Sequence, residues 1–405
     1  MRIPPAADAV LVRYGDIGTK SEPVQRMMER TLRANLRAAL TDAGIEAAVA
    51  GERTRPVIEI DPADVETATT VAARTIGVVS ASPVRRVAPR LEPILEAIAA
   101  TAAAVYDGGS FAVRARRSDK DLAFTSAEIE RRGGDAVFEA ITGFEPAVDL
   151  DEPDVTLFVE ARAASAYVFA DVIDGPGGLP VGSQAPLVAL VSGGIDSPVA
   201  AHRAMRRGSP VVPVYLDLGP FGGPDHQARA LEAIAEVQSL AGTATAPTYV
   251  VPAGDAVERL VETVDRGRML VWRRFMFRVA DRIAQDVDAV GIVTGEALGQ
   301  KSSQTATNLD ATSRVADRPI HRPLFSLDKA EITALARQLG TYRSAQVDAG
   351  CPALVPDRVA TRATPAELDR LEPDDVDRLV AAAVEAAEVL EPDQLATYRS
   401  AASPA

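Results

Sequence analysis

The pattern of hydrophobic and polar positions divides the chain near residue 187. Beyond that point, short apolar runs alternate with longer segments whose apolar residues recur with helical periodicity. The run at 187–191 has no polar alternation, which indicates a strand buried on both faces of a parallel sheet. We predict strands at 187–191, 211–216, 248–252 and 289–294 and a long helix at 268–286. Alternating strands and helices are typical of a doubly wound parallel sheet in an α/β fold.

The residues before this point have a different pattern. Strands are predicted at 9–14, 57–60, 110–116, 155–160 and 166–170. Helices are predicted at 22–43, 65–75, 91–105 and 126–141, the last with Ser126 as its cap. Residues 174–186 are rich in glycine and proline, which predicts a linker. The resulting domains are two α+β domains at 1–75 and 76–173, the linker at 174–186, the parallel-sheet domain at 187–364 and an acidic helical extension at 365–405.

Composition narrows the class of protein. The chain has 405 residues, 47% of them hydrophobic and 25% charged, as expected of several globular domains. It has neither an apolar run of transmembrane length nor a signal-like start, so we expect a cytoplasmic protein with no membrane association. Taken as a sum, the net charge of −14 argues against nucleic-acid binding. Arginines nevertheless cluster locally, so the distribution of charge matters more than the sum.

Cysteine and lysine are both rare. The single cysteine, Cys351, excludes an intrachain disulfide and a zinc site built from several cysteines, and we predict no metal-ligand cluster. Nearly all basic residues are arginine, which we interpret as a salt-adapted or high-GC background. In that background the four lysines, Lys20, Lys120, Lys301 and Lys329, become candidates for function, because ammonium and guanidinium groups are not interchangeable. The alternative is that they were retained at random.

The most informative segment is Ser-Gly-Gly-Ile-Asp-Ser-Pro at 192–198, directly after the first predicted parallel strand. Gly193 and Gly194 allow a tight turn and close approach of the backbone to a ligand. We expect Ser197 to cap the next helix and Pro198 to begin it. A strand, a glycine turn and a helix N-terminus together favour anion binding, although the spacing is not that of a Walker loop. The alternative is an ordinary turn between strand and helix.

The segment at 192–198 resembles the pyrophosphate loop (PP-loop) of ATP pyrophosphatases, which adenylate an oxygen and release pyrophosphate. Other segments resemble the ThiI family of tRNA 4-thiouridine synthetases, in a form without the rhodanese domain, as in archaea and haloarchaea. Residues 12–20 are similar to its ferredoxin-like segment, 110–133 to its RNA-binding THUMP domain, and 294–310 to a block of its PP-loop domain. The resemblance implies ferredoxin-like and THUMP domains followed by a PP-loop ATP pyrophosphatase domain.

The resemblance implies a tRNA uracil 4-sulfurtransferase that uses ATP and Mg²⁺ and acts on uridine 8 of tRNA. The C4 oxygen would attack the α-phosphate of ATP, pyrophosphate would leave, and sulfur would then displace AMP. The expected ATP-binding residues are Leu190, Val191, Ser192, Gly193, Gly194, Asp196, Ser197, Tyr215, Leu216, Arg273, Gly295 and Gln304.

Two alternatives apply to these ATP-binding residues. For Arg273 the alternative is a solvated side chain. For the residues at the strand ends it is plain sheet core: Leu190, Val191, Tyr215 and Leu216.

The expected catalytic residues are Asp196, Lys329 and Cys351. Asp196 would hold Mg²⁺ or orient the loop, with helix capping as the alternative. Lys329 would contact charge in the transition state. Cys351 is a candidate persulfide carrier, with a buried inert thiol as the alternative. Because the chain has one cysteine, we expect an external sulfur donor: a persulfide, sulfide or a carrier-protein thiocarboxylate.

The expected partner is tRNA, bound by the first two domains, because phosphates require basic patches. Relatives also suggest a homodimer. Two alternatives remain open: an amidotransferase-type PP-loop synthetase, and a tRNA-binding protein without catalysis. The candidate tRNA-binding residues are Lys20, Arg114, Arg116, Arg117, Lys120, Arg131 and Arg132.

Overall fold

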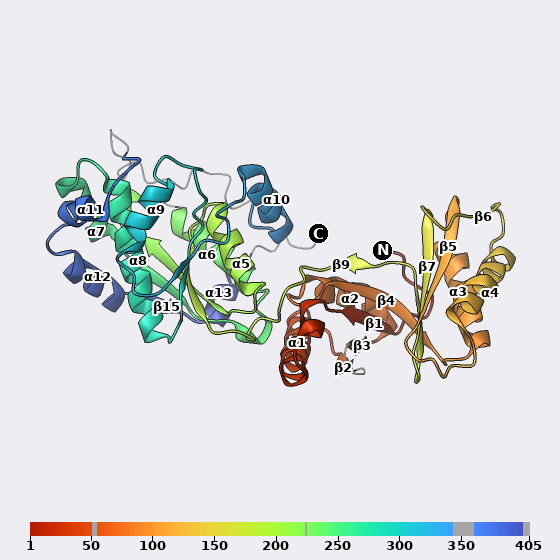
Figure 1. The fold of residues 1–405 in the computed structure, drawn as a ribbon. Coiled ribbons are helices and arrows are strands. Elements are labelled where there is room, and N and C mark those ends of the chain that lie inside the picture. The colour runs from red at the N-terminus through yellow and green to blue at the C-terminus, as the bar shows by residue number, and fades with distance from the viewer. Residues whose placement is uncertain (51–54, 223–224, 343–359, 400–405) are drawn as a thin grey trace. The chain divides into compact units, whose positions relative to one another are not determined.

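The computed structural model of the chain describes residues 1–50, 55–222, 225–342 and 360–399 (Figure 1). Contacts between residues divide it into two compact units, Met1–Leu179 and Pro180–Ala405. Each unit has a β-sheet and its own hydrophobic cores.

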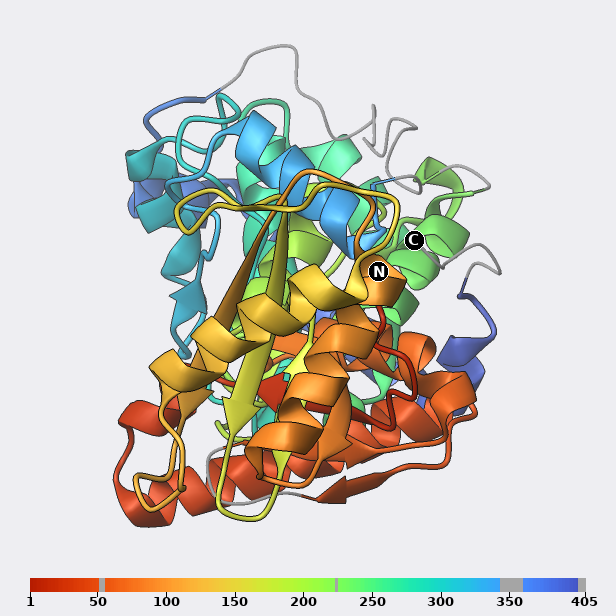
Figure 2. The same cartoon turned by 90° about the vertical axis from the view of Figure 1, so that its right-hand side faces the viewer.

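Unit 1 contains a mostly antiparallel sheet of nine strands in the order β2-β3-β1-β4-β8-β7-β5-β6, with β9 also paired to β4. The strands are β1 Ala9–Arg13, β2 Ala48–Ala50, β3 Val57–Glu59, β4 Ser80–Val87, β5 Ser110–Arg117, β6 Ala147–Val148, β7 Val155–Ala161, β8 Ala166–Phe169 and β9 Ile173–Asp174. The α-helices are α1 Glu22–Asp42, α2 Val65–Arg74, α3 Leu91–Val105 and α4 Ser126–Ala140. Figure 2 shows α3 and α4 packed side by side on this sheet.

Strand β4 joins the two parts of unit 1 that the sequence pattern separates at residue 75. It pairs antiparallel with β1, where Leu11 lies opposite Ser82, and with β8, where Arg86 lies opposite Tyr167. No strand was predicted there, because small residues and Pro83 interrupt the hydrophobic pattern. One sheet therefore runs through both predicted α+β domains.

Helices cover one face of each part of this sheet. Val10 and Val12 of β1 pack with α1 and α2, and Phe111 and Val113 of β5 pack with α3 and α4. The prediction of Ser126 as a cap is wrong: Thr125 is the cap, and its side chain accepts a hydrogen bond from the amide of Glu128. Side chains alternate between the two faces of a strand, so Ala9, Leu11 and Arg13 lie on the face away from α1 and α2.

The segment predicted as a linker is instead largely packed. The amides of Gly175 and Gly177 donate to the carbonyls of Val79 and Val78, and Leu179 is buried in the core of unit 1. A Cβ at Gly175 would lie 2.4 Å from the oxygen of Val78, so only glycine allows this approach. Residues 174–179 are therefore part of unit 1.

Unit 2 contains a six-stranded sheet in the order β14-β13-β10-β11-β12-β15. Its strands are β10 Leu187–Leu190, β11 Val211–Asp217, β12 Thr248–Pro252, β13 Ile292–Val293, β14 Ile320–His321 and β15 Glu388–Leu390. The first five in spatial order are parallel, which confirms the predicted fold class. Strand β15 pairs antiparallel with β12, so the C-terminal extension, predicted as acidic and helical, also contributes a short strand to this sheet.

Helices lie on both faces of this sheet. They are α5 Asp196–Met205, α6 His226–Gln238, α7 Gly254–Thr263, α8 Arg268–Asp286, α9 Ala306–Ser313, α10 Lys329–Leu339, α11 Pro365–Leu371, α12 Val376–Glu385 and α13 Pro392–Ala396. Val214 and Leu216 pack with α7, α8 and α12, whereas Tyr215 between them contacts α6 on the other face. The carboxyl ends of β10, β11 and β13 therefore meet where α5 begins.

Candidate functional site

The glycine loop between β10 and α5 is closed by its two serines. The amide of Ser192 donates to Oγ of Ser197 at 2.9 Å, and the two serine Oγ atoms lie 3.1 Å apart. The amide of Gly194 donates to Oγ of Ser192 at 3.4 Å. Helix α5 begins at Asp196 with Ile195 in the cap position, so the prediction of Ser197 as the cap is wrong. Ser197 holds the loop closed, and the first turn of α5 retains amides without intrahelical partners.

Two glycines bring other segments against this loop. A Cβ at Gly295 would lie 2.7 Å from the amide nitrogen of Ser197, so the segment after β13 touches the start of α5. A Cβ at Gly193 would lie 3.2 Å from Cβ of Arg229 in α6. Both glycines permit a close approach that any larger residue would widen.

Asp196 and Lys329, two predicted catalytic residues, form an ion pair. Nζ of Lys329 lies 2.7 Å from Oδ1 of Asp196, and their side chains are 52% and 23% exposed. Lys329 is the first residue of α10, whose start is held by a capping box between Asp328 and Glu331. The capping box therefore fixes the start of α10 so that the Lys329 side chain lies at the beginning of α5. The ammonium of Lys329 and the carboxylate of Asp196 both remain accessible to a ligand.

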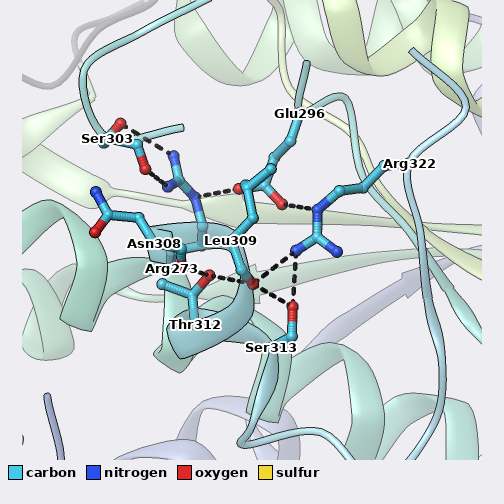
Figure 3. A network of polar contacts seen from close by, with 8 residues as sticks. All are labelled: Arg273, Glu296, Ser303, Asn308, Leu309, Thr312, Ser313 and Arg322. Atoms are coloured by element: carbon cyan, nitrogen blue, oxygen red, sulfur yellow. Dashed lines mark hydrogen bonds and ion pairs between the residues drawn. The ribbon is translucent and has the colours of Figure 1, made fainter. Parts of the chain in front are cut away.

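Arg273 belongs to a buried charge network centred on Glu296 (Figure 3). Oε1 of Glu296 lies 2.8 Å from Nε of Arg273, and Oε2 lies 2.9 Å from Nε of Arg322. Arg273 also donates to the carbonyl of Ser303 at 3.1 Å, and Arg322 to Oγ of Ser313 at 2.9 Å. Arg273 is only 7% exposed, so the alternative of a solvated arginine is wrong. The network fixes the segment after β13 to helix α8.

Sequence reasoning missed Glu296 and Arg322. A usable signal was present, because Glu296 lies three residues after the buried strand β13, where an ionised carboxylate requires a basic partner. The partners lie on α8 and just after β14, and nothing in the local sequence identifies them.

The predicted residues at the strand ends are buried. Leu190, Val191, Tyr215 and Leu216 are each less than 9% exposed, so their side chains belong to the sheet core. The phenol of Tyr215 lies 2.8 Å from Nδ1 of His226, and burial raises the pKa of Tyr215 above its ordinary value. Only the backbone of these residues is available at the carboxyl edge of the sheet.

Two glutamines near this edge have buried polar atoms without a protein partner. Within the described residues, Oε1 of Gln304 accepts no hydrogen bond, and neither polar atom of the Gln300 side chain makes one. An unsatisfied buried polar atom costs about 1–3 kcal/mol, which a bound ligand can recover. The amide oxygen of Gln304, a predicted ATP-binding residue, therefore lacks a partner among the described residues.

The candidate tRNA-binding residues do not share one surface. Arg114 and Arg116 are exposed on β5, whereas Arg117 alternates to the other face and donates to the carbonyls of Leu122 and Phe124. On α4, Arg131 and Arg132 form ion pairs with Asp135 and Glu128. Lys20 and Lys120 are exposed in loops.

Three remaining predictions concern Cys351, metal-ligand clusters and membrane association. Cys351 falls outside the described residues. Among the residues that the structure describes, no group of three or more His, Cys, Asp or Glu side chains is arranged to hold a metal ion. No helix in the described ranges has the length and apolar character needed to cross a membrane.

Comparison with known proteins identifies the family. A probable tRNA sulfurtransferase of Halobacterium salinarum is 52% identical over 373 residues, which cover 92% of this chain and 94% of the relative. The chain belongs to the ThiI family of tRNA sulfurtransferases. A probable tRNA sulfurtransferase of Methanosarcina acetivorans is 38% identical over 88% of this chain and 87% of the relative.

Three family models match this ThiI-family chain in order. The ThiI ferredoxin-like domain matches residues 9–82, the THUMP domain residues 89–171, and the model described as thiamine biosynthesis protein (ThiI) residues 182–374. A crystal structure described as a 4-thiouridine synthetase–RNA complex with bound ATP is 28% identical, with a TM-score of 0.82, and covers 95% of this chain and 100% of the other. The predicted family and order of folds are therefore confirmed.

Proposed function

We propose that this protein is an ATP-dependent tRNA sulfurtransferase that converts uridine 8 of tRNA to 4-thiouridine in the cytoplasm. The observation that carries the proposal is the serine-closed loop before α5, with the Asp196–Lys329 pair beside it, in a chain of the ThiI family. The solved relative with RNA and ATP supports the same substrates.

The loop and the start of α5 provide the site for the triphosphate of ATP. The amides at the beginning of a helix, together with the helix dipole, attract phosphate oxygens. Ser192, Gly193, Gly194 and Ser197 would surround the pyrophosphate, and Gly295 allows the neighbouring segment to close on it. Gln304 would recognise the nucleotide through its unpaired amide oxygen, while Arg273 positions the segment at Ser303. The backbone of Leu190, Val191, Tyr215 and Leu216 would line the base.

Asp196 fits a role in holding Mg²⁺. Its carboxylate is partly exposed beside the phosphate loop, and Mg²⁺ commonly binds one or two carboxylates together with substrate phosphates. When bound, Mg²⁺ would neutralise charge on the triphosphate. Lys329, already 2.7 Å from Asp196, would move its ammonium onto phosphate oxygens as the pyrophosphate leaves.

The reaction then has two displacements. The C4 oxygen of the uridine attacks the α-phosphate, and the bond to pyrophosphate breaks. The sulfur nucleophile adds to C4, and AMP leaves with the former C4 oxygen.

We assign Cys351 as the persulfide carrier when the donor is an external persulfide: the Cys351 thiolate takes the outer sulfur and the donor thiol leaves. After the terminal sulfur has bonded to C4, an external thiol cleaves the remaining S–S bond. Sulfide would instead add to C4 directly, and a carrier-protein thiocarboxylate would add through its sulfur and then be hydrolysed, so neither donor forms a persulfide on Cys351. Thiolation by Cys351→Ala at the wild-type rate with a persulfide donor would remove Cys351 from the covalent mechanism.

RNA recognition belongs to unit 1 in this proposal, with domains at 1–75 and 76–173 and adenylation at 187–364. Four of the predicted RNA contacts are exposed and form no salt bridge within the described part of the chain: Lys20, Arg114, Arg116 and Lys120. A homodimer is part of the proposal and is testable by light scattering.

The decisive experiment combines two measurements. Release of pyrophosphate from ATP is measured with and without tRNA, and tRNA nucleosides are analysed by mass spectrometry after addition of sulfide. We expect tRNA-dependent pyrophosphate release and formation of 4-thiouridine. Formation of an amidated nucleoside would favour the amidotransferase-type synthetase, and tRNA binding without pyrophosphate release would favour a non-catalytic protein.

A further inference from the structure

Besides the Glu296 network of unit 2, a cluster of arginines lies in unit 1, on the face of the sheet away from α1 and α2. We call it the guanidinium cluster: Arg13 in β1, Arg55 just before β3, Arg116 in β5 and Arg162 just after β7, around Glu160 of β7. Two of the four, Arg13 and Arg162, come from opposite parts of the joined sheet. Only one member, Arg116, was a candidate residue from sequence.

Glu160 is the centre of the cluster and is 4% exposed. Its Oε1 lies 2.9 Å from Nη2 of Arg162, and its Oε2 lies 2.5 Å from Nη1 of Arg55 and 3.9 Å from Nη2 of Arg13. Arg116 lies opposite Glu160 in the pairing of β5 with β7. Among the described residues of the cluster, one carboxylate therefore lies beside four guanidinium groups, which leaves a local excess of positive charge.

Burial and the neighbouring charges both act on Arg13. The pKa of Arg13 lies below its ordinary value, chiefly because burial disfavours the charged form. Glu160 raises this pKa, but Arg55, Arg162 and Arg116 lower it by repulsion. A bound anion would relieve this repulsion.

Aromatic rings hold two of these guanidinium groups in place. The guanidinium carbon of Arg13 lies 4.9 Å from the ring centre of Phe169, and that of Arg162 lies 4.8 Å from the ring centre of Tyr167. Phe158 stacks on Phe169 with ring centres 5.1 Å apart. Cation–π contacts of this kind restrict the arginines before any ligand arrives, which reduces the entropy cost of binding.

We propose that the guanidinium cluster is a binding site for a phosphate group, and that its occupant is a backbone phosphate of RNA. Arginine forks match phosphate oxygens in bidentate geometry, and a local excess of guanidinium groups favours an anion. The outer side is open to a ligand, because the Arg13 and Arg55 side chains are 23% and 28% exposed and Arg116 is exposed. The choice of RNA over free phosphate rests on the proposed function.

The test uses Arg55→Gln and Arg116→Gln in the full chain, singly and combined. Arg90→Gln is the matched control, because Arg90 is exposed in the same unit just before α3. Binding of a tRNA transcript is measured at several salt concentrations. We expect each cluster variant to bind about tenfold more weakly at low salt and to lower the salt slope by about 1, as for one lost phosphate contact. The control should match the wild type in both quantities.

Each outcome decides a separate question. If the cluster variants bind tRNA as the control does, the proposed site is wrong, whereas ATP- and tRNA-dependent thiolation by the wild type would still support the proposed function. If the wild type binds no tRNA, the proposed function fails, and inorganic phosphate becomes the probe. Thermal stabilisation of the wild type but not of the double variant by phosphate would then assign the site to free phosphate and overturn the RNA occupant. Equal stabilisation of both proteins would overturn the site itself.

Discussion

Removal of the Glu296 carboxylate should destabilise unit 2. Its carboxylate lies between two arginines whose side chains are 8% and 13% exposed, Arg273 and Arg322. In Glu296→Ala both guanidinium groups lose their carboxylate partner while remaining buried. Breaking a buried pair from one side costs about 3–5 kcal/mol, and we expect a loss of unfolding free energy in that range.

The chain carries a suitable probe for this measurement. Trp272 is its single tryptophan, is 6% exposed and precedes Arg273 in α8. Urea unfolding followed by tryptophan fluorescence therefore reports on unit 2 even if unit 1 unfolds separately. The matched control is Asp310→Asn, which breaks an ion pair with Arg314 whose side chains are 57% and 63% exposed, and should cost less than about 1 kcal/mol.

A double-mutant cycle makes the reasoning refutable. Arg322→Met removes one of the two stranded charges, so Glu296→Ala combined with Arg322→Met should lose less stability than the sum of the single variants. Additive losses, or a loss in Glu296→Ala no larger than that of Asp310→Asn, would show that the buried network does not stabilise this unit. Because Arg273 contacts Ser303, Glu296→Gln should also raise KM for ATP.

Three further predictions test the site and its surroundings. Gly295→Ala should lower kcat/KM for ATP, because its Cβ would lie 2.7 Å from the amide nitrogen of Ser197, and this overpacking should cost about 1–3 kcal/mol. The control is Gly18→Ala, whose Cβ would have no atom within 4 Å, and equal kinetics of the two variants would contradict the close approach at Gly295. Lys329→Ala should slow pyrophosphate release by about tenfold to a hundredfold, with Lys329→Arg intermediate, and an unchanged rate would exclude Lys329 from catalysis. Burial lowers the pKa of His202 from 6.5 to about 4, so between these pH values the unfolded state binds a proton that the folded state does not, and the free energy of unfolding should fall by about 3 kcal/mol as pH drops from 6.5 towards 4. Thermal melts of His202→Asn should show a smaller decrease in stability over that window, and a decrease identical to that of the wild type would rule out His202 as its source.

The sequence by itself determined the local features of this protein. Helices 91–105 and 268–286 match α3 and α8, because amphipathic periodicity is set by neighbouring residues. The strand, glycine turn and helix start at 187–198 were also recognisable, together with the family. Local patterns were enough for the helices and the loop because each depends on neighbouring residues, and the family was recognisable from several such segments taken together.

Tertiary structure alone decided which distant residues meet. The pairing of Asp196 with Lys329 joins positions 133 residues apart, and β4 and β15 became strands through long-range pairing that their own patterns do not predict. Glu296 and Glu160 have arginine partners from other elements, and no local period encodes such partners. The physical reason is that a buried charge is tolerated only where the fold brings it a partner, and that partner is defined by packing rather than by distance along the chain.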